Sequence, residues 1–541
     1  MLPALVALGL VGSGLLLGFA GLPALPETAW RAIGLTGTIA TFVLMVLGIG
    51  LGFDPEQIGF QFIEFFGWPE APGAHLLLGV DGIGLCFLIS TAGLVPLAML
   101  SSQSEIQGSV RGWVFACLLL ESSLLGALAS VNYLSFVFFW AASLVPILLW
   151  MGRWGGVGRA RAASRIWTTE AFGLAGLLFV AFLLRESSLD QLGTATLDLV
   201  TTPVLRELSL LDVRLAPTDQ LLLFLVLMTS LATRLPLVPL HFWLPGAHAS
   251  APTGLSVLLA TGFVQTAAVG VLRFALPLFP NAAVDAGPIL SVVGIVALVY
   301  ASLIALVQKE LKRLVAYTWV ACAGFAVFGI STLNVQGLTG AVLQLLVHGL
   351  ATAALFMLIG FLALRRGTTD VAAFGGLAKP MPVCAFFFAL MVFSLMGLPL
   401  LGGFVGDLFV LLGSLETRRE LSVVALTAMV VGASYLLWVQ RRLFLGPVDE
   451  PANRGLIDLD RIERGILLMM TIPIVFIGVY PNPVLRRIEP AVLEILNQME
   501  RGYVSEVPDV PDVPEEEIAD PEAGVEVVWT DWLSARAGGR R

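Results

Sequence analysis

The stretch LLLFLVLMTSLATRLPLVPLHFWLPGAHAS, residues 221–250, decides the fold class. Its apolar start is typical of a helix that enters a bilayer, whose hydrocarbon about 20 such residues can span. Pro236, Pro239 and Pro245 then remove backbone donors and interrupt the helix. Non-helical backbone survives at membrane depth only inside protein or beside water. The stretch therefore predicts a broken membrane helix next to a transport path.

A second apolar run, residues 380–414, is interrupted by Gly397-Leu-Pro-Leu-Leu-Gly-Gly403. Broken helices at corresponding positions of two halves of a chain are the best sequence indication of a transport site. The two breaks fall in the seventh and twelfth predicted spans, five helices apart. We therefore expect two five-helix repeats in inverted orientation, over residues 112–277 and 286–440.

Similar apolar runs fill most of the 541-residue chain, which is 57% hydrophobic and only 13% charged. They do not alternate apolar and polar residues as barrel strands do. The sequence thus predicts an all-α integral membrane protein of about fourteen transmembrane helices. Around the repeats we expect an N-terminal three-helix segment (1–111), a loop with the last span (441–485) and an acidic tail (486–541). The expected spans are 2–22, 30–52, 78–100, 112–130, 132–152, 167–185, 218–246, 253–277, 286–307, 314–332, 336–364, 380–414, 420–440 and 465–481.

The basic loops predict the orientation. The positive-inside rule assigns them to the cytoplasm, and all of them fall on one side of the predicted topology. Both termini are then extracytoplasmic. The tail is acidic from Glu506 to Glu526 and is either a solvated segment or a docking segment for a neighbouring subunit. The basic loops are Arg153–Arg165, Lys309–Arg313, Arg365–Lys379 and Arg441–Arg464.

No redox centre is expected in this chain. Its four cysteines stand singly in apolar runs, without the spacing of metal or redox sites. The sequence also contains no nucleotide-binding loop, haem motif or iron–sulfur motif. We therefore expect no cofactor and no metal here. The expected surroundings are the lipid bilayer and other membrane subunits, and no nucleic acid.

Ionisable side chains inside the spans are functional candidates because a charge in a bilayer is expensive. Asp407 follows the second break and is either a proton-exchanging carboxylate or a helix-end carboxylate in water. His348 lies mid-span and either relays protons as a neutral imidazole or is a core histidine bonded to backbone. Residue type alone does not separate these alternatives.

Arg234 keeps its protons at any working pH, so it can fix charge but cannot shuttle a proton. We expect it in a static ion pair, with Glu121 as the candidate partner. Glu121 could instead be a pore acid. His241 and His248 flank the first break, where they either line a water path or cap broken backbone. The remaining proton-pathway candidates lie at span edges and are Lys309 and Lys312.

Six segments carry a family resemblance, and two of them contain the breaks. They are Val80–Ile83, Phe139–Pro146, Arg234–Thr253 with the first break, Gln265–Phe274, Lys312–Gly324, and Gly397–Asp407 with the second break. As a set they resemble the antiporter-like proton-channel subunits of complex I-type NADH:quinone oxidoreductases, most closely the M type. The resemblance covers residues 75–445. It implies a bacterial inner-membrane location, membrane-arm partners of the L, N and K types, and FMN, iron–sulfur clusters and quinone in partner subunits.

The sequence departs from the family pattern at several titratable positions. In the family, a lysine passes on a proton when its glutamate partner moves away. Alanine, arginine and glutamine cannot perform this step, so we expect the first half-channel to be impaired. The histidine at His348 is kept. The substitutions that the resemblance implies are glutamate to Ala141, lysine to Arg234, lysine to Gln265, histidine to Cys322, an acid to Gly246 and glutamate to Asp407.

Three functions remain open at this stage. The first is a complex I subunit that couples quinone reduction to proton translocation. The second is a subunit of a cation/proton antiporter or an ion-coupled uptake complex. The third is a structural membrane-arm spacer that has lost pumping. Any enzymatic activity belongs to the assembly, because this chain lacks redox motifs of its own.

Overall fold

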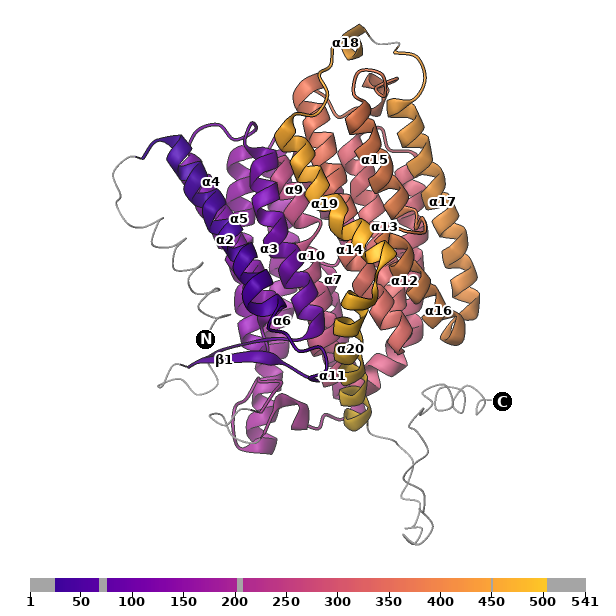
Figure 1. Cartoon of the computed structure of the whole chain (residues 1–541). Coiled ribbons are helices and arrows are strands. Elements are labelled where there is room, and N and C mark those ends of the chain that lie inside the picture. Colours follow the sequence, from indigo (N-terminus) through magenta and orange to yellow (C-terminus); the bar gives the residue numbers. More distant parts are fainter. Residues whose placement is uncertain (1–24, 68–74, 202–207, 449–450, 504–541) are drawn as a thin grey trace.

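Long apolar helices, stacked side by side, make up nearly all of this computed structural model, which describes residues 25–67, 75–201, 208–448 and 451–503 (Figure 1). Eleven helices of this described part are long and apolar enough to cross a membrane, and Pro217–Ala232 and Pro382–Leu395 are shorter apolar helices. The chain is therefore a multi-pass membrane protein. The expected span 2–22 lies outside the described residues, so the count of about fourteen helices stays a prediction.

The N-terminal segment contains a hairpin that the sequence analysis did not predict. Helix α2 (Glu27–Leu44) continues into a π-helical turn, η1 (Met45–Gly50). Strands β1 (Gln61–Gly67) and β2 (His75–Val80) then pair antiparallel, with Gly67 opposite His75. Helix α3 (Gly82–Ser102) begins later than the expected 78 because Asp81 caps it, accepting a hydrogen bond of 2.6 Å from the Gly84 amide.

The next helices form one side of the bundle. They are α4 (Val110–Ala129), α5 (Tyr133–Trp154), α6 (Arg159–Leu192) and α7 (Pro217–Ala232), with the short 3₁₀ turn η2 (Leu210–Asp212) before α7. Helix α6 has 34 residues and extends beyond the expected span 167–185 at both ends. It packs between α5 and α7, so its residues face the first break.

The first interrupted run continues further than the sequence suggested. After α7 the chain turns through η3 (Leu240–Trp243) into α8 (Leu244–Ser250). The expected continuous span 253–277 is itself divided into α9 (Thr253–Leu259), α10 (Gly262–Val269), the π-helical η4 (Gly270–Ala275) and α11 (Leu276–Leu278). Thr261 separates α9 from α10 with a non-helical conformation, φ −127° and ψ −100°. No proline marks this interruption, which explains why the sequence reading missed it.

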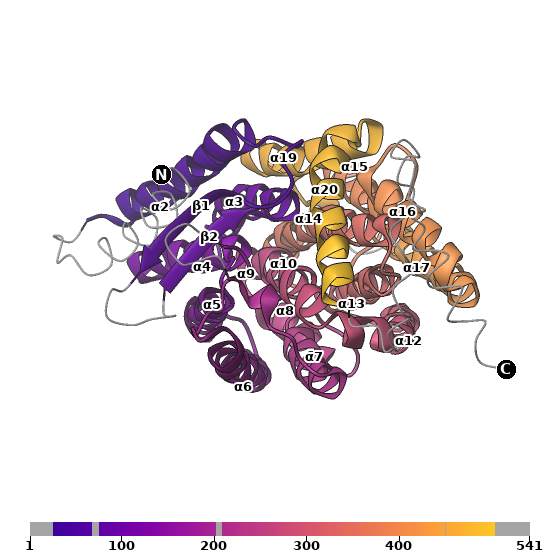
Figure 2. The same ribbon diagram turned by 90° about the horizontal axis from the view of Figure 1, so that it is seen from below.

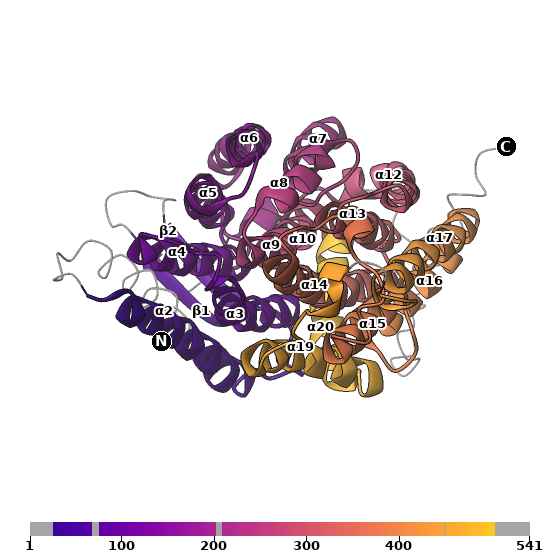
Figure 3. The ribbon, with the colours of Figure 1, turned by 90° about the horizontal axis from the view of Figure 1, so that it is seen from above.

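The second side of the bundle contains α12 (Pro280–Leu306), α13 (Leu311–Ile330), α14 (Val335–Arg366), α15 (Pro382–Leu395), α16 (Gly402–Thr417), α17 (Arg419–Phe444) and α19 (Arg461–Val479). Two short elements, η5 (Val371–Ala373) and α18 (Pro451–Arg454), lie in its loops. The apolar windows of α14 and of Thr253–Leu278 are buried throughout. Figures 2 and 3 view the bundle from its two ends and place α10 and α14 near the centre, with α2, α6, α12 and α17 outside.

The first part of the expected tail is a helix, which corrects our assignment of residues from 486 onward. Helix α20 (Asn482–Gly502) runs across one end of the bundle (Figure 2) and contacts α3, α11, α12 and α14. It was missed because it is amphipathic rather than apolar, with a buried stripe at helical spacing. The rest of the tail, residues 504–541, lies outside the described residues. The buried stripe consists of Ile488, Ala491, Val492, Ile495, Leu496 and Met499.

Candidate functional site

The second break positions a carboxylate inside the bundle. Helix α15 ends at Leu395 and α16 begins at Gly402. Between them, Gly397 adopts a φ of +70°, a conformation that favours glycine. A Cβ at Gly397 would lie 2.6 Å from Oδ2 of Asp407, so the carboxylate packs directly against the broken backbone. Asp407 is only 4% exposed, and neither of its oxygens accepts a hydrogen bond from a described residue.

His348 faces this carboxylate from the central helix α14. Its Nε2 lies 3.7 Å from Oδ1 of Asp407 and makes no hydrogen bond with the residues that the structure describes. Its Nδ1 lies 3.3 Å from Sγ of Cys322 on α13. One ring nitrogen of the histidine thus contacts Cys322, and the other faces Asp407. This position argues against a core histidine whose ring nitrogens are bonded to backbone.

A cavity of about 40 Å³ adjoins these three side chains. A polar cavity can hold water once it offers roughly 10–15 Å³ to a water-sized probe. This cavity is large enough for water and brings Gln344 and Tyr435 beside the three titratable groups. Its other wall comes from α12 and α17, where the Cβ position of Gly432 has open space within 4 Å. Asp407, His348 and this cavity form what we call the second-half site.

The first break positions an arginine, but its partner is not the expected one. Arg234 is fully buried and lies in the turn that follows α7. Its guanidinium donates to Oε2 of Glu170 at 3.0 and 3.2 Å, to Oγ1 of Thr266 at 3.1 Å and to the Trp140 carbonyl at 3.3 Å. The expected partner, Glu121, forms no hydrogen bond within the described part of the chain.

Two aromatic rings complete the environment of the arginine. Its Cζ atom lies 3.5 Å from the ring centre of Trp140 and 3.9 Å from that of Phe263. Such stacking is favourable for a desolvated guanidinium. Arg234 is thus held by charge, hydrogen bonds and ring contacts together. We call Arg234 and Glu170 the first-half pair.

Glu170 is the site residue that sequence reasoning missed. It lies inside the expected span 167–185, so the general signal of a carboxylate in an apolar run was present. In the expected span, Glu170 lies about one turn from the first residue, where water can solvate the carboxylate and no charged partner is needed. Helix α6 instead begins at Arg159, which places Glu170 about three turns into the helix and opposite α7.

The other predicted residues around the first interruption are not among the hydrogen-bond partners of Arg234. Gln265 on α10 accepts a hydrogen bond of 3.2 Å from Thr91. Ala141 follows Trp140 on α5 and is half-buried. His248 is fully buried and stacks on Phe356 with ring centres 4.3 Å apart. Neither nitrogen of His248 bonds a described residue, so it caps no described part of the broken backbone.

His241 and the two lysines lie near the ends of the interruption. His241 packs edge-on against Tyr300, with ring centres 5.3 Å apart. Lys309 is exposed, whereas Lys312 at the start of α13 is buried and donates to the Ala251 carbonyl at 2.8 Å. Lys312 therefore stabilises the irregular backbone between α8 and α9. Within the described residues, no three His, Cys, Asp or Glu side chains are arranged to hold a metal ion.

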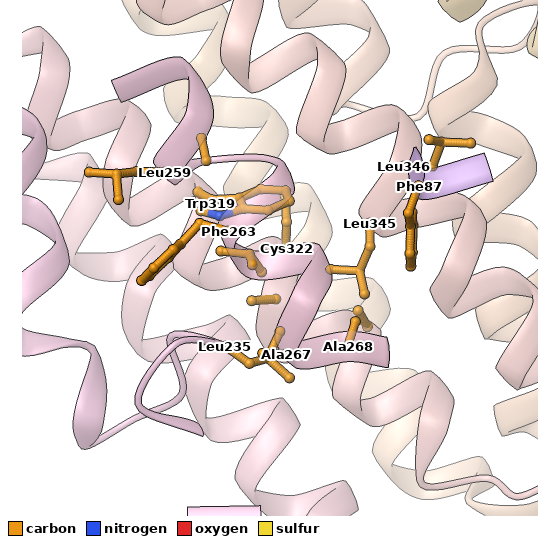
Figure 4. Close-up of a cluster of buried hydrophobic side chains, with 14 of the residues drawn as sticks. Phe87, Leu235, Leu259, Phe263, Ala267, Ala268, Trp319, Cys322, Leu345 and Leu346 are labelled. Atoms are coloured by element: carbon orange, nitrogen blue, oxygen red, sulfur yellow. The ribbon is translucent and has the colours of Figure 1, made fainter. Parts of the chain in front are cut away.

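An apolar cluster lies between the two sites. Figure 4 shows side chains from three central helices packed together, among them Phe263 and Ala267 of α10, Trp319 and Cys322 of α13, and Leu345 of α14. Phe263 also stacks on Arg234, and Cys322 also contacts His348. The cluster thus extends from the first-half pair to the second-half site.

Comparison with known proteins agrees with this architecture. The family model described as NADH:quinone oxidoreductase/Mrp antiporter, transmembrane, matches residues 130–432. The chain belongs to this family. It is 34% identical to NADH-quinone oxidoreductase subunit M of Rhodobacter capsulatus over 468 residues, which cover 86% of this chain and 90% of the relative. It is 33% identical to NADH-ubiquinone oxidoreductase chain 4 of Chondrus crispus, over 88% of this chain and 94% of the relative.

Two solved structures have the same fold as this chain. A chain of respiratory complex I from Thermus thermophilus with bound NADH superposes with a TM-score of 0.81 at 27% identity, covering 92% of this chain and all of that one. A chain of the Mrp complex from Dietzia sp. DQ12-45-1b gives a TM-score of 0.77 at 17% identity, over 93% and 98% of the two chains. At that identity the second likeness concerns the fold alone.

Proposed function

We propose that this chain is a membrane-arm subunit of a proton-translocating NADH:quinone oxidoreductase and that protons pass through its second-half site. The main support for the proposal is that Nε2 of His348 lies 3.7 Å from Oδ1 of Asp407, beside a cavity that can hold water. The identity to subunit M relatives supports the assignment to this enzyme class.

The chemistry of the second-half site suits proton exchange. Buried polar groups are normally hydrogen-bonded, and water is the remaining partner for the carboxylate oxygens of Asp407 and for Nε2 of His348. A carboxylate and an imidazole are both side chains that can gain and lose a proton. The chain of groups from Asp407 through water to His348 can therefore carry a proton between α16 and α14.

The first-half pair has the opposite character, and we propose that it is static. Arg234 does not release its proton, and Glu170 accepts two hydrogen bonds from it without access to solvent. Gln265 and Ala141 nearby have no group to titrate. The pair can set the local potential and join α6 to the first break. Proton exchange through the first half is impaired in this proposal.

The wider assignment follows from the family and the topology. We propose two inverted five-helix repeats with discontinuous seventh and twelfth spans, both termini on the extracytoplasmic side, and a location in a bacterial inner membrane. Neighbouring membrane-arm subunits of the L, N and K types are the proposed partners. FMN, iron–sulfur clusters and quinone belong to partner subunits, and the oxidoreductase activity belongs to the assembly.

Replacement of Asp407 by asparagine tests the proposal. In the assembled enzyme in sealed vesicles, Asp407→Asn should lower the number of protons moved per NADH oxidised, while NADH oxidation with an uncoupler is retained. Asp370→Asn is a matched control, because Asp370 is an exposed carboxylate in the loop before η5. An unchanged proton ratio in Asp407→Asn would instead favour the spacer function. Proton-linked cation movement without NADH would favour the antiporter function.

A further inference from the structure

Cys322 occupies an unusual place beside the second-half site. It lies in the middle of α13, is 8% exposed and lines the same cavity as His348 and Asp407. Its Sγ atom is 3.3 Å from Nδ1 of His348, within hydrogen-bonding range for sulfur. Among the described residues, the imidazole of His348 makes no other hydrogen bond. The thiol therefore contacts Nδ1 directly, whereas Nε2 faces Asp407.

The two ring nitrogens of a neutral histidine have different roles. One carries a proton and donates, and the other has a lone pair and accepts. The bond made by one nitrogen decides which tautomer is present and hence what the other nitrogen offers. The S–H group of a thiol is a weak donor and its sulfur is a weak acceptor. An imidazole lone pair is a strong acceptor, so S–H donation to this lone pair is the better pairing. This pairing places the ring proton on Nε2.

The proton on Nε2 then points towards the carboxylate. Nε2 is the nitrogen that lies 3.7 Å from Oδ1 of Asp407. The approach to it is open because residue 403 on α16 is a glycine, whose added Cβ would lie 2.9 Å from Nε2. With the other tautomer, the proton would face Cys322 and the lone pair would face Asp407. The direction in which the site can pass a proton thus depends on the tautomer.

We propose that Cys322 is a positioning residue that donates its thiol proton to Nδ1 of His348 and thereby holds the ring proton on Nε2, facing Asp407. The effect of this tautomer on proton transfer rests on the proposed function of the second-half site. The tautomer itself can be measured independently of that function. Cys322 takes no proton from the pathway and acts only through His348.

Nitrogen-15 NMR tests the tautomer directly. The full chain has four histidines, so histidine-labelled protein in lipid bilayers gives few ring signals, and His348→Gln assigns those of His348. In the unmodified chain and in Cys322→Ser, which keeps a donor, the Nε2–H tautomer should dominate. Cys322→Ala should shift the tautomer ratio by about three- to tenfold, the net effect of one hydrogen bond. Cys117→Ala, which removes a buried thiol from α4, should leave it unchanged.

The result that overturns the inference is an Nδ1–H tautomer in the unmodified chain, or an unchanged ratio in Cys322→Ala. A second measurement separates this failure from failure of the proposed function. In the assembled enzyme, Cys322→Ala should lower the protons moved per NADH and Cys322→Ser should restore them. If Asp407→Asn pumps normally, the proposed function fails whatever the tautomer. If Asp407→Asn pumps poorly and Cys322→Ala leaves the tautomer unchanged, only the positioning role fails.

Discussion

Glu170→Gln removes the carboxylate charge from the first-half pair while it preserves the side chain's shape. Arg234 then keeps a full positive charge with no exposed surface, between the rings of Trp140 and Phe263. The Thr266 hydroxyl, the Trp140 carbonyl and the amide oxygen of the new glutamine can accept its hydrogen bonds. None of them carries a compensating charge. We therefore expect Glu170→Gln to destabilise the packing of α6 against the first break.

The magnitude follows from the geometry. Opposite charges 3.0 Å apart attract by about 5 kcal/mol at an effective dielectric constant of about 20. Removing one partner of a buried pair typically costs about 3–5 kcal/mol, because the other charge stays buried alone. Replacing both partners with apolar residues is often nearly neutral. The double variant Glu170→Leu with Arg234→Met should therefore recover most of the stability that either single substitution loses.

The assay compares two readouts on the same variants. Resistance of the chain to heat in detergent reports stability, and protons moved per NADH in the assembled enzyme report function. Glu186→Gln is the control for a lost pair, because Glu186 and Arg185 are 42% and 49% exposed and such pairs contribute about 1 kcal/mol or less. A double variant with recovered stability should pump normally. If it is stable but moves fewer protons, the pair takes part in transfer and the static interpretation is wrong.

Three further outcomes are expected from the packing. Gly432→Val should keep the fold, because nothing lies within 4 Å of the added Cβ. It should lower the number of protons moved per NADH, because the side chain fills the cavity. Gly465→Val on α19 is the control: its added Cβ is equally unobstructed, and the number of protons moved should not change. Gly82→Ala should lower the free energy of unfolding by about 1–3 kcal/mol, because its Cβ would lie 1.6 Å from the Arg487 carbonyl oxygen of α20. A lower melting temperature in detergent would report this loss. Arg365→Gln should lower the free energy of unfolding by about 1.5–3 kcal/mol, because Arg365 donates hydrogen bonds to two carbonyls of the loop before α19. Hydrogen exchange in that loop should become faster.

The sequence predicted the helical membrane class, and it singled out Asp407 as a candidate, because both depend on local composition. Apolar runs of sufficient length indicate spans, and Gly397 with Pro399 indicates an interruption close to Asp407. The structure has α15 ending at Leu395 and Asp407 buried beside Gly397. These outcomes needed no knowledge of which helices are neighbours.

The parts that the sequence did not predict depend on packing. Glu121 and Glu170 are both carboxylates in apolar runs, and only the contact of α6 with α7 makes Glu170 the partner of Arg234. The interruption at Thr261 has no proline within eight residues and only a single glycine, Gly262, next to it, so the local signal is weak. Helix α20 lacks an apolar run because only one face is buried. The hairpin β1–β2 lies after the expected span 30–52, and its second strand overlaps the start of the expected span 78–100.

The two buried sites differ in how well their polar groups are satisfied, and this difference bears on function. In the first half, the guanidinium has four hydrogen bonds and a counter-charge, so any change of protonation must break several contacts at once. In the second half, both oxygens of Asp407 and Nε2 of His348 have no described protein partner and adjoin a cavity, so water can exchange without loss of protein contacts. The apolar cluster that contains Phe263 and Cys322 contacts Arg234 in the first half and His348 in the second. This difference is what the proposed function requires, with proton exchange at the second-half site and a fixed charge at the first-half pair.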